Sequence, residues 1–473
     1  MKSIYKIILS LVFLTSSVAC DSYLDVNDNP NQLVALPSGD LMLLGTLLAN
    51  AQIQQGQLAR TSMYYTGGLI GLQLVQETLY NYNYTPGDSN AVWGLIYNGV
   101  LVQNKEIRRL SPNVGILQGI IDVNEAMAVG TGASLFGDIP YSTAVPDNPG
   151  VGSPDPTLDA QADVYAALQT LLDNAIPKLQ NGSSTGVTNS QDNYFGGDED
   201  KWIAAAYTLK ARYYLQTKQY SQALANVVNG INSSSGTMSY NPIGTVQDGN
   251  TNILYNFVNS SRAGDMTGEG TFYRDLLDVG NSNSRNNVKT DETARRNYSF
   301  IDGDGEQAGG IDDPATPMKL VSYEENLLIW AECLLRVNGD TQGAIDKLNE
   351  LRAHLRSGNA FNNLGGGLQY DDYVLVDFQA GGMENMDNIT TDRAVLREII
   401  EERYVTGFST FMPFNDARRL RASDSDIIVP FPLNTTSATM NPQRFLYAQE
   451  EINNNSNLPD PIPDLFTPTP VNQ

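Results

Sequence analysis

The chain has 473 residues, and its 53 aspartates and glutamates outnumber 29 lysines and arginines, which gives a formal net charge of −24. A nucleic-acid-binding surface needs clustered basic side chains, so this balance excludes that class of protein. Hydrophobic residues make up 41% of the chain, which is enough for a packed core. The two cysteines, Cys20 and Cys333, are too few for a disulfide scaffold.

The N-terminal segment has the parts of a secretory signal. Lys2 and Lys6 precede an apolar run over residues 7–14, which is shorter than the roughly 20 residues that span a bilayer. The small residues of "SSVA" then lead to Cys20, an order that resembles a bacterial lipobox. We predict a signal peptide over residues 1–19 and lipidation of Cys20, with membrane contact through the lipid anchor only. The alternative is an ordinary secretory signal in which the cysteine is incidental.

Periodicity along the rest of the chain predicts helices. Residues 20–40 are rich in Asn and Asp and are predicted to form a tether, and apolar spacing predicts a first helix over residues 41–58. Two apolar stripes separated by a polar turn recur in residues 202–231 and 323–355, which predicts two helix hairpins. Such hairpins cannot bury their apolar faces alone, so they need neighbouring helices.

Details of these segments favour a tetratricopeptide-like architecture. In the second hairpin, Gly339 suits a helix C-terminus and Asp340 can cap the helix that follows. Further helices are predicted around residues 164–179 and 394–405, and Gly/Pro/Asn-rich loops separate the pieces. The predicted fold class is therefore all-α, with tetratricopeptide-like hairpins as a scaffold and long irregular loops that serve in binding.

Six stretches, in order along the chain, resemble the SusD/RagB family of outer-membrane nutrient-binding lipoproteins of Bacteroidetes-type bacteria. They are "CDSYLDVNDNPN", "LFGDIPYSTA", "WIAAAYTLKARYYL", "PMKLVSYEENLLIWAECLLR", "EERYVTGFSTFMPFNDARRL" and "NPQRFLYAQEEINNN". Two departures are Ala448, where family members often have proline, and Phe414, near which they often have tryptophan. The resemblance identifies residues 41–473 as a SusD-like domain.

The resemblance implies a function in nutrient uptake. A family member captures glycans or oligosaccharides at the cell surface and passes them to a TonB-dependent, SusC-like transporter in the outer membrane. It carries out no chemical reaction and needs no cofactor. A family member that captures peptides or proteins on the same scaffold is the alternative, because its sequence would look almost identical.

The residues themselves also argue against an enzyme. His354 is the single histidine of the chain, which excludes zinc motifs with two histidines. Its charged neighbours on a predicted helix indicate a surface position. A glycosidase requires two carboxylates at a set separation, which neighbours in sequence such as Glu401 and Glu402 do not establish. In a chain this acidic, such pairs are expected on solvated faces or as helix caps.

The acidic turn "DGDGE", residues 302–306, has the alternating oxygen ligands of a calcium loop. An EF-hand loop would have glycine at its sixth position and glutamate at its twelfth, where this chain has Gln307 and Asp313. The favoured interpretation is an acidic turn without metal, and bound calcium remains the alternative.

A tyrosine-rich stretch gives the favoured ligand-binding candidates. Tyr80, Tyr82 and Tyr84 alternate with asparagines, so an extended backbone would point all three rings to one side. Aromatic rings suit the C–H faces of sugars, and Asn83 can hydrogen-bond to hydroxyl groups. The alternative is that these rings pack in the core, which is also the predicted position of Trp93.

The segment "ARRNYSF" supplies a second candidate. Arg295, Arg296 and Tyr298 could bind an anionic sugar or a peptide carboxylate, because guanidinium groups bind carboxylates in bidentate fashion. The favoured alternative is that these arginines neutralise surrounding acidic residues. Arg418 and Arg419 are expected to be structural and to tie helices to loops.

Overall fold

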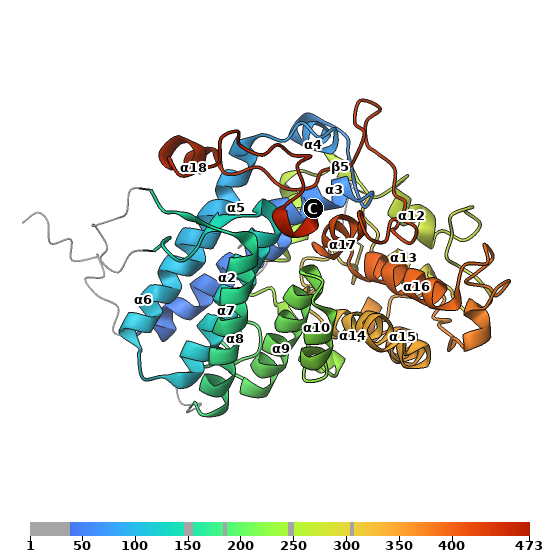
Figure 1. Ribbon diagram of the computed structural model, residues 1–473, viewed down its shortest axis with the longest axis horizontal. Helices are drawn as coiled ribbons and strands as arrows, with labels where there is room; N and C mark the ends of the chain where they lie inside the picture. The colour runs from blue at the N-terminus through green and yellow to red at the C-terminus, as the bar shows by residue number, and fades with distance from the viewer. Residues whose placement is uncertain (1–37, 146–154, 183–186, 245–249, 303–306) are drawn as a thin grey trace, which may run out of the picture.

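The computed structural model describes residues 38–145, 155–182, 187–244, 250–302 and 307–473 (Figure 1). Helices dominate these ranges, and the strands in them form three short antiparallel pairs. The pairs are β1 (Ile70–Gly71) with β5 (Met266–Thr267), β2 (Ile139–Pro140) with β3 (Leu158–Asp159), and β4 (Met238–Tyr240) with β6 (Met318–Val321). The predicted all-α fold class is confirmed.

The first part of the chain, up to residue 180, forms a layer of helices that pack side by side. Its α-helices are α2 (Asp40–Gln55), α3 (Gln57–Tyr65), α4 (Leu74–Tyr80), α5 (Asn90–Gly94), α6 (Val102–Leu110), α7 (Gly115–Phe136) and α8 (Gln161–Gln180). Short η helices are η1 (Pro86–Ser89) and η2 (Leu95–Leu101). Helix α7 lies at the centre of this layer, and 20 of its 22 residues are buried.

Close approach to the next helix explains one glycine of α7. A Cβ at Gly130 would lie 2.3 Å from the ring of Tyr213 on α9 (Glu199–Gln216). The same tyrosine donates a hydrogen bond of 2.8 Å to the carbonyl oxygen of Ala126. The contact therefore fixes α7 against the first predicted hairpin.

Both predicted hairpins form. The first consists of α9 and α10 (Tyr220–Val227), and the second of α14 (Tyr323–Asn338) and α15 (Thr341–Arg356). Gly339 ends α14 in the left-handed conformation, with φ of 62°, and Asp340 Oδ1 accepts a hydrogen bond from the Gly343 amide at 2.8 Å. Both turn residues act as the sequence predicts.

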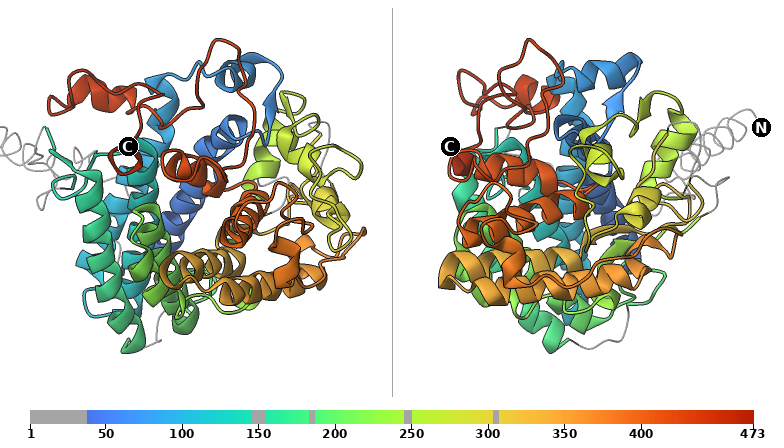
Figure 2. Two further views of the ribbon diagram at one scale, coloured as in Figure 1. Left: turned by 45° about the vertical axis from the view of Figure 1, so that its right-hand side comes forward. Right: turned by 90° about the vertical axis from the view of Figure 1, so that its right-hand side faces the viewer.

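The two hairpins pack against each other through a buried apolar cluster that includes two alanines. Ala211, Ala223, Ile329 and Cys333 are fully buried in one cluster to which α9, α10 and α14 contribute. Helix α14 also packs on α16 (Thr391–Thr406), so the helices continue in a curved row from α7 to α16 (Figure 2). Small residues at these positions let the helix axes come close.

The remaining elements are short and follow α10 in the chain, between and after the longer helices. They are η3 (Ser234–Gly236), α11 (Ile253–Tyr255), η5 (Asn256–Ser261), α12 (Phe272–Leu277), α13 (Thr293–Tyr298), η6 (Asn359–Phe361), η7 (Leu375–Phe378), α17 (Met412–Leu420), α18 (Gln449–Asn454) and η8 (Pro470–Asn472). Within the described ranges, no helix combines the length and the apolarity that crossing a bilayer requires.

The C-terminal segment returns to the first helices of the chain. The amide of Phe445 donates to the carbonyl oxygen of Leu135 at 2.9 Å, and the Tyr447 hydroxyl donates to that of Asp138 at 2.8 Å. Arg418, which is 1% exposed, donates to the carbonyl oxygen of Ser134 at 2.7 Å. Arg419 pairs with Glu332 at 2.6 Å. The expected structural role of both arginines is confirmed.

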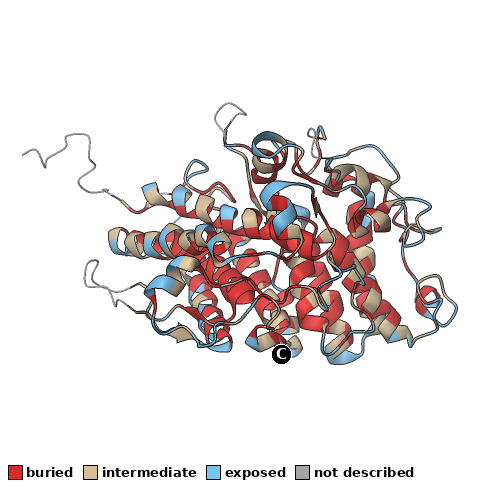
Figure 3. Ribbon diagram, turned by 90° about the horizontal axis from the view of Figure 1, so that it is seen from above, coloured by how far each residue is buried: buried red, intermediate tan, exposed pale blue. Residues whose placement is uncertain are grey.

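Burial along the chain bears on three predictions (Figure 3). Trp93 is 7% exposed and packs on Phe136, so its predicted core position is confirmed. The C-terminal end of the helix predicted over residues 41–58 is wrong, because α2 ends at Gln55 and a second helix, α3, begins after Gly56. The surface position predicted for His354 is also wrong. Its side chain is 10% exposed because it faces α14, with Nε2 3.3 Å from Glu324 Oε1.

Candidate ligand surface at helix α4

Helix α4 is held at an edge of the molecule by the β1–β5 pair. The Leu72 amide donates to the carbonyl oxygen of Asp265 at 2.8 Å, and Gln73 Nε2 donates to Asp265 Oδ1 at 2.7 Å. Leu74 begins the helix with a φ of 54°, a conformation that leucine rarely adopts. Backbone strain of this kind persists only where the surroundings impose it, and it is common at binding sites.

The helix turns one face inward and leaves apolar side chains in solvent. Its buried residues are Gln76, whose Oε1 accepts from the Tyr64 hydroxyl at 2.9 Å, and Leu79. Leu74 is 64% exposed and Val75 is 50% exposed, as is Leu72 just before the helix. Large apolar side chains at such exposure on a fixed element are available to a ligand.

We call the exposed part of residues 72–83 the α4 surface. Tyr80 is half-buried, with its ring edge-to-face on Tyr64 at 6.3 Å between centroids, and Asn83 is exposed. Asn434 from the C-terminal segment donates to the Tyr80 carbonyl oxygen at 2.9 Å, which fixes the end of the helix. Of the four residues predicted in this stretch, Tyr80 and Asn83 reach solvent.

The extended backbone predicted for this stretch is wrong. Tyr80 is helical and Tyr82 has a φ of 65°, so the three rings do not alternate along a strand. Tyr82 and Tyr84 are each 7% exposed. Their rings pack edge-to-face on Tyr65 and Phe445, at 5.5 and 5.2 Å. The predicted role of Tyr82 and Tyr84 as open platforms is corrected to core packing.

The hydroxyl groups of both tyrosines are also occupied. Tyr82 donates to Asn441 Oδ1 at 2.5 Å and accepts from the amide of Asn434 at 2.9 Å. The Tyr84 hydroxyl lies 2.8 Å from Ser89 Oγ. Burial raises the pKa of Tyr82 to about 12. These rings attach the C-terminal segment beneath the α4 surface and thereby support it.

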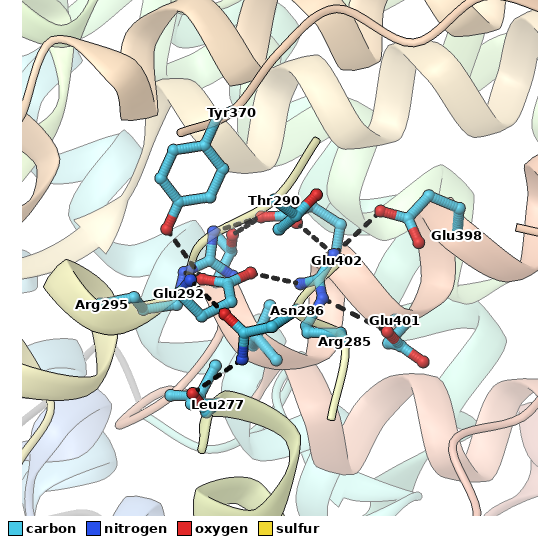
Figure 4. Close-up of polar contacts among 12 residues, drawn as sticks. Leu277, Arg285, Asn286, Thr290, Glu292, Arg295, Tyr370, Glu398, Glu401 and Glu402 are labelled. Carbon is cyan, nitrogen blue, oxygen red and sulfur yellow. Dashed lines mark hydrogen bonds and ion pairs between the residues drawn. The ribbon is translucent and has the colours of Figure 1, made fainter. Parts of the chain in front are cut away.

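Arg295 lies in a buried ionic cluster instead of a ligand site (Figure 4). Its side chain is 3% exposed, and Nη2 lies 2.6 Å from Glu402 Oε1 while Nε lies 3.2 Å from Glu292 Oε2. Arg285 is the second cation, and its Nη2 lies 2.8 Å from both Glu398 and Glu402. The ligand contact proposed for Arg295 is therefore wrong, and the favoured alternative, that this arginine neutralises surrounding acidic residues, is confirmed.

The cluster contains more carboxylates than arginines. Burial opposes ionisation of Glu402, but the positive charges of Arg295 and Arg285 have the larger combined effect. They lower the pKa of Glu402 to about 2. For Glu398 burial prevails over Arg285, and neighbouring Glu384 and Glu401 add repulsion, so its pKa lies well above the usual range. The sequence expectation of a solvated face for Glu402 is wrong, since its side chain is 3% exposed.

The other two residues of "ARRNYSF" point to different surroundings. Arg296 forms an ion pair with Asp278 near the surface. Tyr298 is half-buried, with its ring 6.1 Å from that of Phe361, and it lines a cavity of about 110 Å³ at the centre of the molecule. The three residues do not meet in one site, and a cavity of this size is too small for an oligosaccharide.

Four predictions fall wholly or mostly on residues that the structure does not describe. They are the signal peptide over residues 1–19, the lipidation of Cys20, the tether over residues 20–40, of which only residues 38–40 are described, and the calcium alternative, since residues 303–306 of that turn are outside the described ranges. In the part of the chain that is described, no three His, Cys, Asp or Glu side chains gather as metal ligands would.

The comparisons with known proteins agree with this fold. The model of the SusD-like family described as "Starch-binding associating with outer membrane" matches residues 38–404, and the chain belongs to this family. The family is one of binding proteins associated with the outer membrane and not of enzymes. The comparison with curated proteins found no match.

Solved structures of the same family resemble the chain over most of its length. A SusD/RagB family protein from Bacteroides thetaiotaomicron is 19% identical, with a TM-score of 0.67 over 89% of this chain and 95% of that one. A SusD homologue from Bacteroides fragilis is 14% identical, with a TM-score of 0.68 over 92% and 100%. A chitin-binding SusD homologue from Flavobacterium johnsoniae is 17% identical, with a TM-score of 0.62 over 89% and 92%.

Sequence reasoning missed the apolar half of the α4 surface. Leu72, Leu74 and Val75 are not among the residues predicted above, and the sequence carries only a weak signal for their exposure. The run "GLIGLQLVQ" contains two glycines and, at Gln73 and Gln76, two glutamines, so it lacks the continuous apolar face of a core helix.

Proposed function

We propose that this chain is a cell-surface lipoprotein that binds glycans and delivers captured oligosaccharides to a TonB-dependent, SusC-like outer-membrane transporter. The observation that carries the proposal is the α4 surface, where exposed apolar side chains at the start of α4 and the exposed amide of Asn83, just beyond its end, flank a helix fixed by β1, β5 and the C-terminal segment. Membership of a family of outer-membrane-associated starch-binding proteins supports it.

The chemistry of the α4 surface suits a sugar. The C–H faces of a pyranose ring are apolar and can lie on Leu72, Leu74 and Val75, while its hydroxyls exchange hydrogen bonds with Asn83. Tyr80 offers part of a ring with a polar tip. A few such contacts give a dissociation constant on the order of micromolar to millimolar, which also allows release to the transporter.

Anchoring at the cell surface is a separate part of the proposal. Lipidation of Cys20 would tether the folded domain, which begins at α2, through the intervening residues. A lipid anchor with several acyl chains holds a protein stably at a membrane, whereas one chain holds it only marginally. The domain would thus stay at the membrane that holds the proposed transporter.

The test is a glycan array, run in parallel with a peptide pull-down, on the chain lacking residues 1–20. We expect glycans to bind, and we expect mass spectrometry of recovered glycans to show unchanged length. Enrichment of peptides without any glycan signal would contradict the sugar cargo. Shortened glycans would contradict the binding-only role.

A further inference from the structure

An open groove lies between α16 and the loop that precedes this helix, and its volume is about 340 Å³. One face of α16 supplies Arg397, Glu398 and Glu401, which are spaced three or four residues apart. Residues 383–387 of the loop form the opposite wall. In Figure 1, α16 lies on a different side of the molecule from α4. The groove is therefore separate from the α4 surface.

Hydrogen bonds fix the loop beside the helix. Asn385 is fully buried, and its Nδ2 donates to the carbonyl oxygen of Phe378 at 2.9 Å. Glu384 Oε1 accepts from Asn287 Nδ2 and from the Tyr373 hydroxyl, both at 2.9 Å. The side chains that the loop presents to the groove are thus held on a fixed backbone.

Apolar side chains are exposed at the mouth of the groove. Met386 is 74% exposed and Met383 is half-buried. The amide of Glu384 donates to the carbonyl oxygen of Asp377 at 2.9 Å, and just before Asp377 the side chain of Val376 is 60% exposed. Exposed apolar side chains on a fixed backbone indicate an interaction surface, and methionine adapts its shape to a partner.

The carboxylates of the groove have few cations of their own. Within the described ranges Glu384 forms no ion pair, since both of its donors are neutral. The side chain of Glu401 is 30% exposed, and its Oε1 lies 3.3 Å from Arg285 Nε, a cation that three other glutamates share. Arg397 is occupied by Asp387, to which it donates at 2.8 and 2.9 Å. The groove therefore carries an excess of negative charge.

Glu398 adds a carboxylate oxygen without a partner. This residue is 6% exposed, and Oε1 accepts both of its hydrogen bonds, from Arg285 Nη2 at 2.8 Å (Figure 4) and from the Tyr373 hydroxyl at 3.1 Å. In the described part of the chain Oε2 accepts no hydrogen bond, yet it keeps contact with solvent, unlike the unpaired polar atoms sealed in the core. Because Glu398 lines the groove, this oxygen is available to a donor bound there.

A polypeptide amine fits these features better than a metal ion. No three His, Cys, Asp or Glu side chains of the described ranges gather as metal ligands would, and methionine side chains offer little to a hard cation. A lysine side chain carries three donors at the end of a four-carbon apolar stem. The stem can lie along apolar surface while the ammonium group reaches the carboxylates. The exposed Val376 can contact the residues beside that lysine, which a small free amine lacks.

We propose that this groove is a docking site for a lysine side chain of a partner polypeptide. Glu384, Glu398 and Glu401 accept hydrogen bonds from the ammonium group, and Met383 and Met386 cover the aliphatic stem. The groove and the α4 surface lie apart, so polypeptide docking and glycan binding can fail independently of each other.

Methyl resonances of the two groove methionines report binding directly at the site. The probe is a capped pentapeptide with lysine between two leucines, titrated at millimolar concentration into the chain lacking residues 1–20 with carbon-13 methyl-labelled methionine. Loss of a signal in Met383→Leu and in Met386→Leu assigns the two resonances. The same peptide with acetyl-lysine lacks the charge and keeps the stem. Glucosamine and calcium chloride serve as a small amine and as a metal ion.

Two variants test the contacts. Glu401→Gln removes a charge from the groove and leaves Arg285 with its other three glutamates. Its matched control is Asp392→Asn, because Asp392 is an exposed acid on the same helix that does not line the groove. Met386→Ser removes the exposed apolar side chain, with Met383 as the remaining reporter.

We expect the lysine peptide to shift both methyl resonances saturably in the wild type and in Asp392→Asn. Binding should be at least about threefold weaker in Glu401→Gln, as for an exposed ion pair, and also weaker in Met386→Ser. The acetyl-lysine peptide should bind more weakly than the lysine peptide, and added salt should weaken binding of the lysine peptide.

Four results would overturn the proposal. The first is the absence of a saturable shift in the wild type. The second is equal binding of the lysine and acetyl-lysine peptides, which would show apolar contact without recognition of the charge. The third is tighter binding of glucosamine or calcium than of the lysine peptide, which would assign the groove to another class of ligand. The fourth is unchanged affinity in both Glu401→Gln and Met386→Ser, which would place the binding elsewhere.

Discussion

The small side chain of Ala211 allows the helices of the two hairpins to pack closely. It is fully buried in the cluster with Ala223, Ile329 and Cys333, where three helices meet. Replacement by tryptophan must displace a helix, and overpacking of this kind costs about 1–3 kcal/mol or more. We expect Ala211→Trp to lower the free energy of unfolding by at least that amount in chemical denaturation.

The matched control for this substitution lies on the same hairpin. Ala225 is exposed on α10, so Ala225→Trp adds the same side chain without entering the cluster. We expect its free energy of unfolding to stay within about 0.5 kcal/mol of the wild type. Equal effects of the two substitutions would contradict the hairpin packing described above.

Single residues were predictable from sequence where their partners are near in the chain. Gly339 and Asp340 end one helix and cap the next through contacts within a few residues, so local rules suffice. Tyr82 hydrogen-bonds to Asn441, 359 residues away, and no local rule anticipates that contact. For this reason the sequence predicts that the rings of Tyr82 and Tyr84 are available to a ligand, whereas in the structure the C-terminal segment covers them.

At the scale of elements, amphipathic helices were predictable and the central one was not. Helices α8, α9, α14 and α16 have one apolar face, and all four match predicted segments. Helix α7 is buried on every side, so its apolar and small residues show no period that marks a face. The six matching stretches supplied the order of elements, but the position of α7 at the centre required the three-dimensional structure.

Helix α16 carries two buried glutamates with opposite pH behaviour. The pKa of Glu398 is raised, so the folded chain favours the protonated form of this glutamate. The contribution of protonated Glu398 to the free energy of unfolding is fully present below the ordinary pKa of 4.5 and is lost as the pH rises. The pKa of Glu402 is lowered to about 2, so the folded chain favours the ionised form of this glutamate. The contribution of ionised Glu402 to the free energy of unfolding is fully present above pH 4.5 and is lost as the pH falls towards 2.

Glutamine at each position removes the titration. We expect the stability of Glu398→Gln relative to the wild type to increase as the pH rises above 4.5. The stability of Glu402→Gln relative to the wild type should decrease as the pH rises from about 2 to 4.5. Denaturant unfolding curves recorded both below and above pH 4.5 provide the measurement. Parallel pH profiles for the two variants would contradict the charge distribution in the cluster.

At the scale of the whole molecule, the proposal joins a folded binding domain to a lipid anchor. Replacing Cys20 by alanine removes the thiol that would be acylated, so Cys20→Ala should abolish incorporation of labelled fatty acid and release the chain from the membrane fraction. Cys333 is 0% exposed, and burial raises its pKa to about 12, so it offers no alternative thiol in the folded chain. Continued labelling of Cys20→Ala would contradict the anchor.

The central claim is that the α4 surface binds a glycan without altering it. Leu74→Asn removes an exposed apolar side chain and keeps a residue that tolerates a φ of 54°. The control is Val288→Asn, because Val288 is 80% exposed on a different loop, which contacts Gln369. Neither substitution should lower the melting temperature, since neither side chain is packed.

Calorimetric titration of the best array ligand into wild type, Leu74→Asn and Val288→Asn, with mass analysis of the ligand afterwards, is the most direct measurement. We predict that Leu74→Asn weakens binding by roughly tenfold, about 1.4 kcal/mol, that Val288→Asn binds as the wild type does, and that the ligand keeps its length. Equal affinity for all three proteins, or a shortened ligand, would contradict the account.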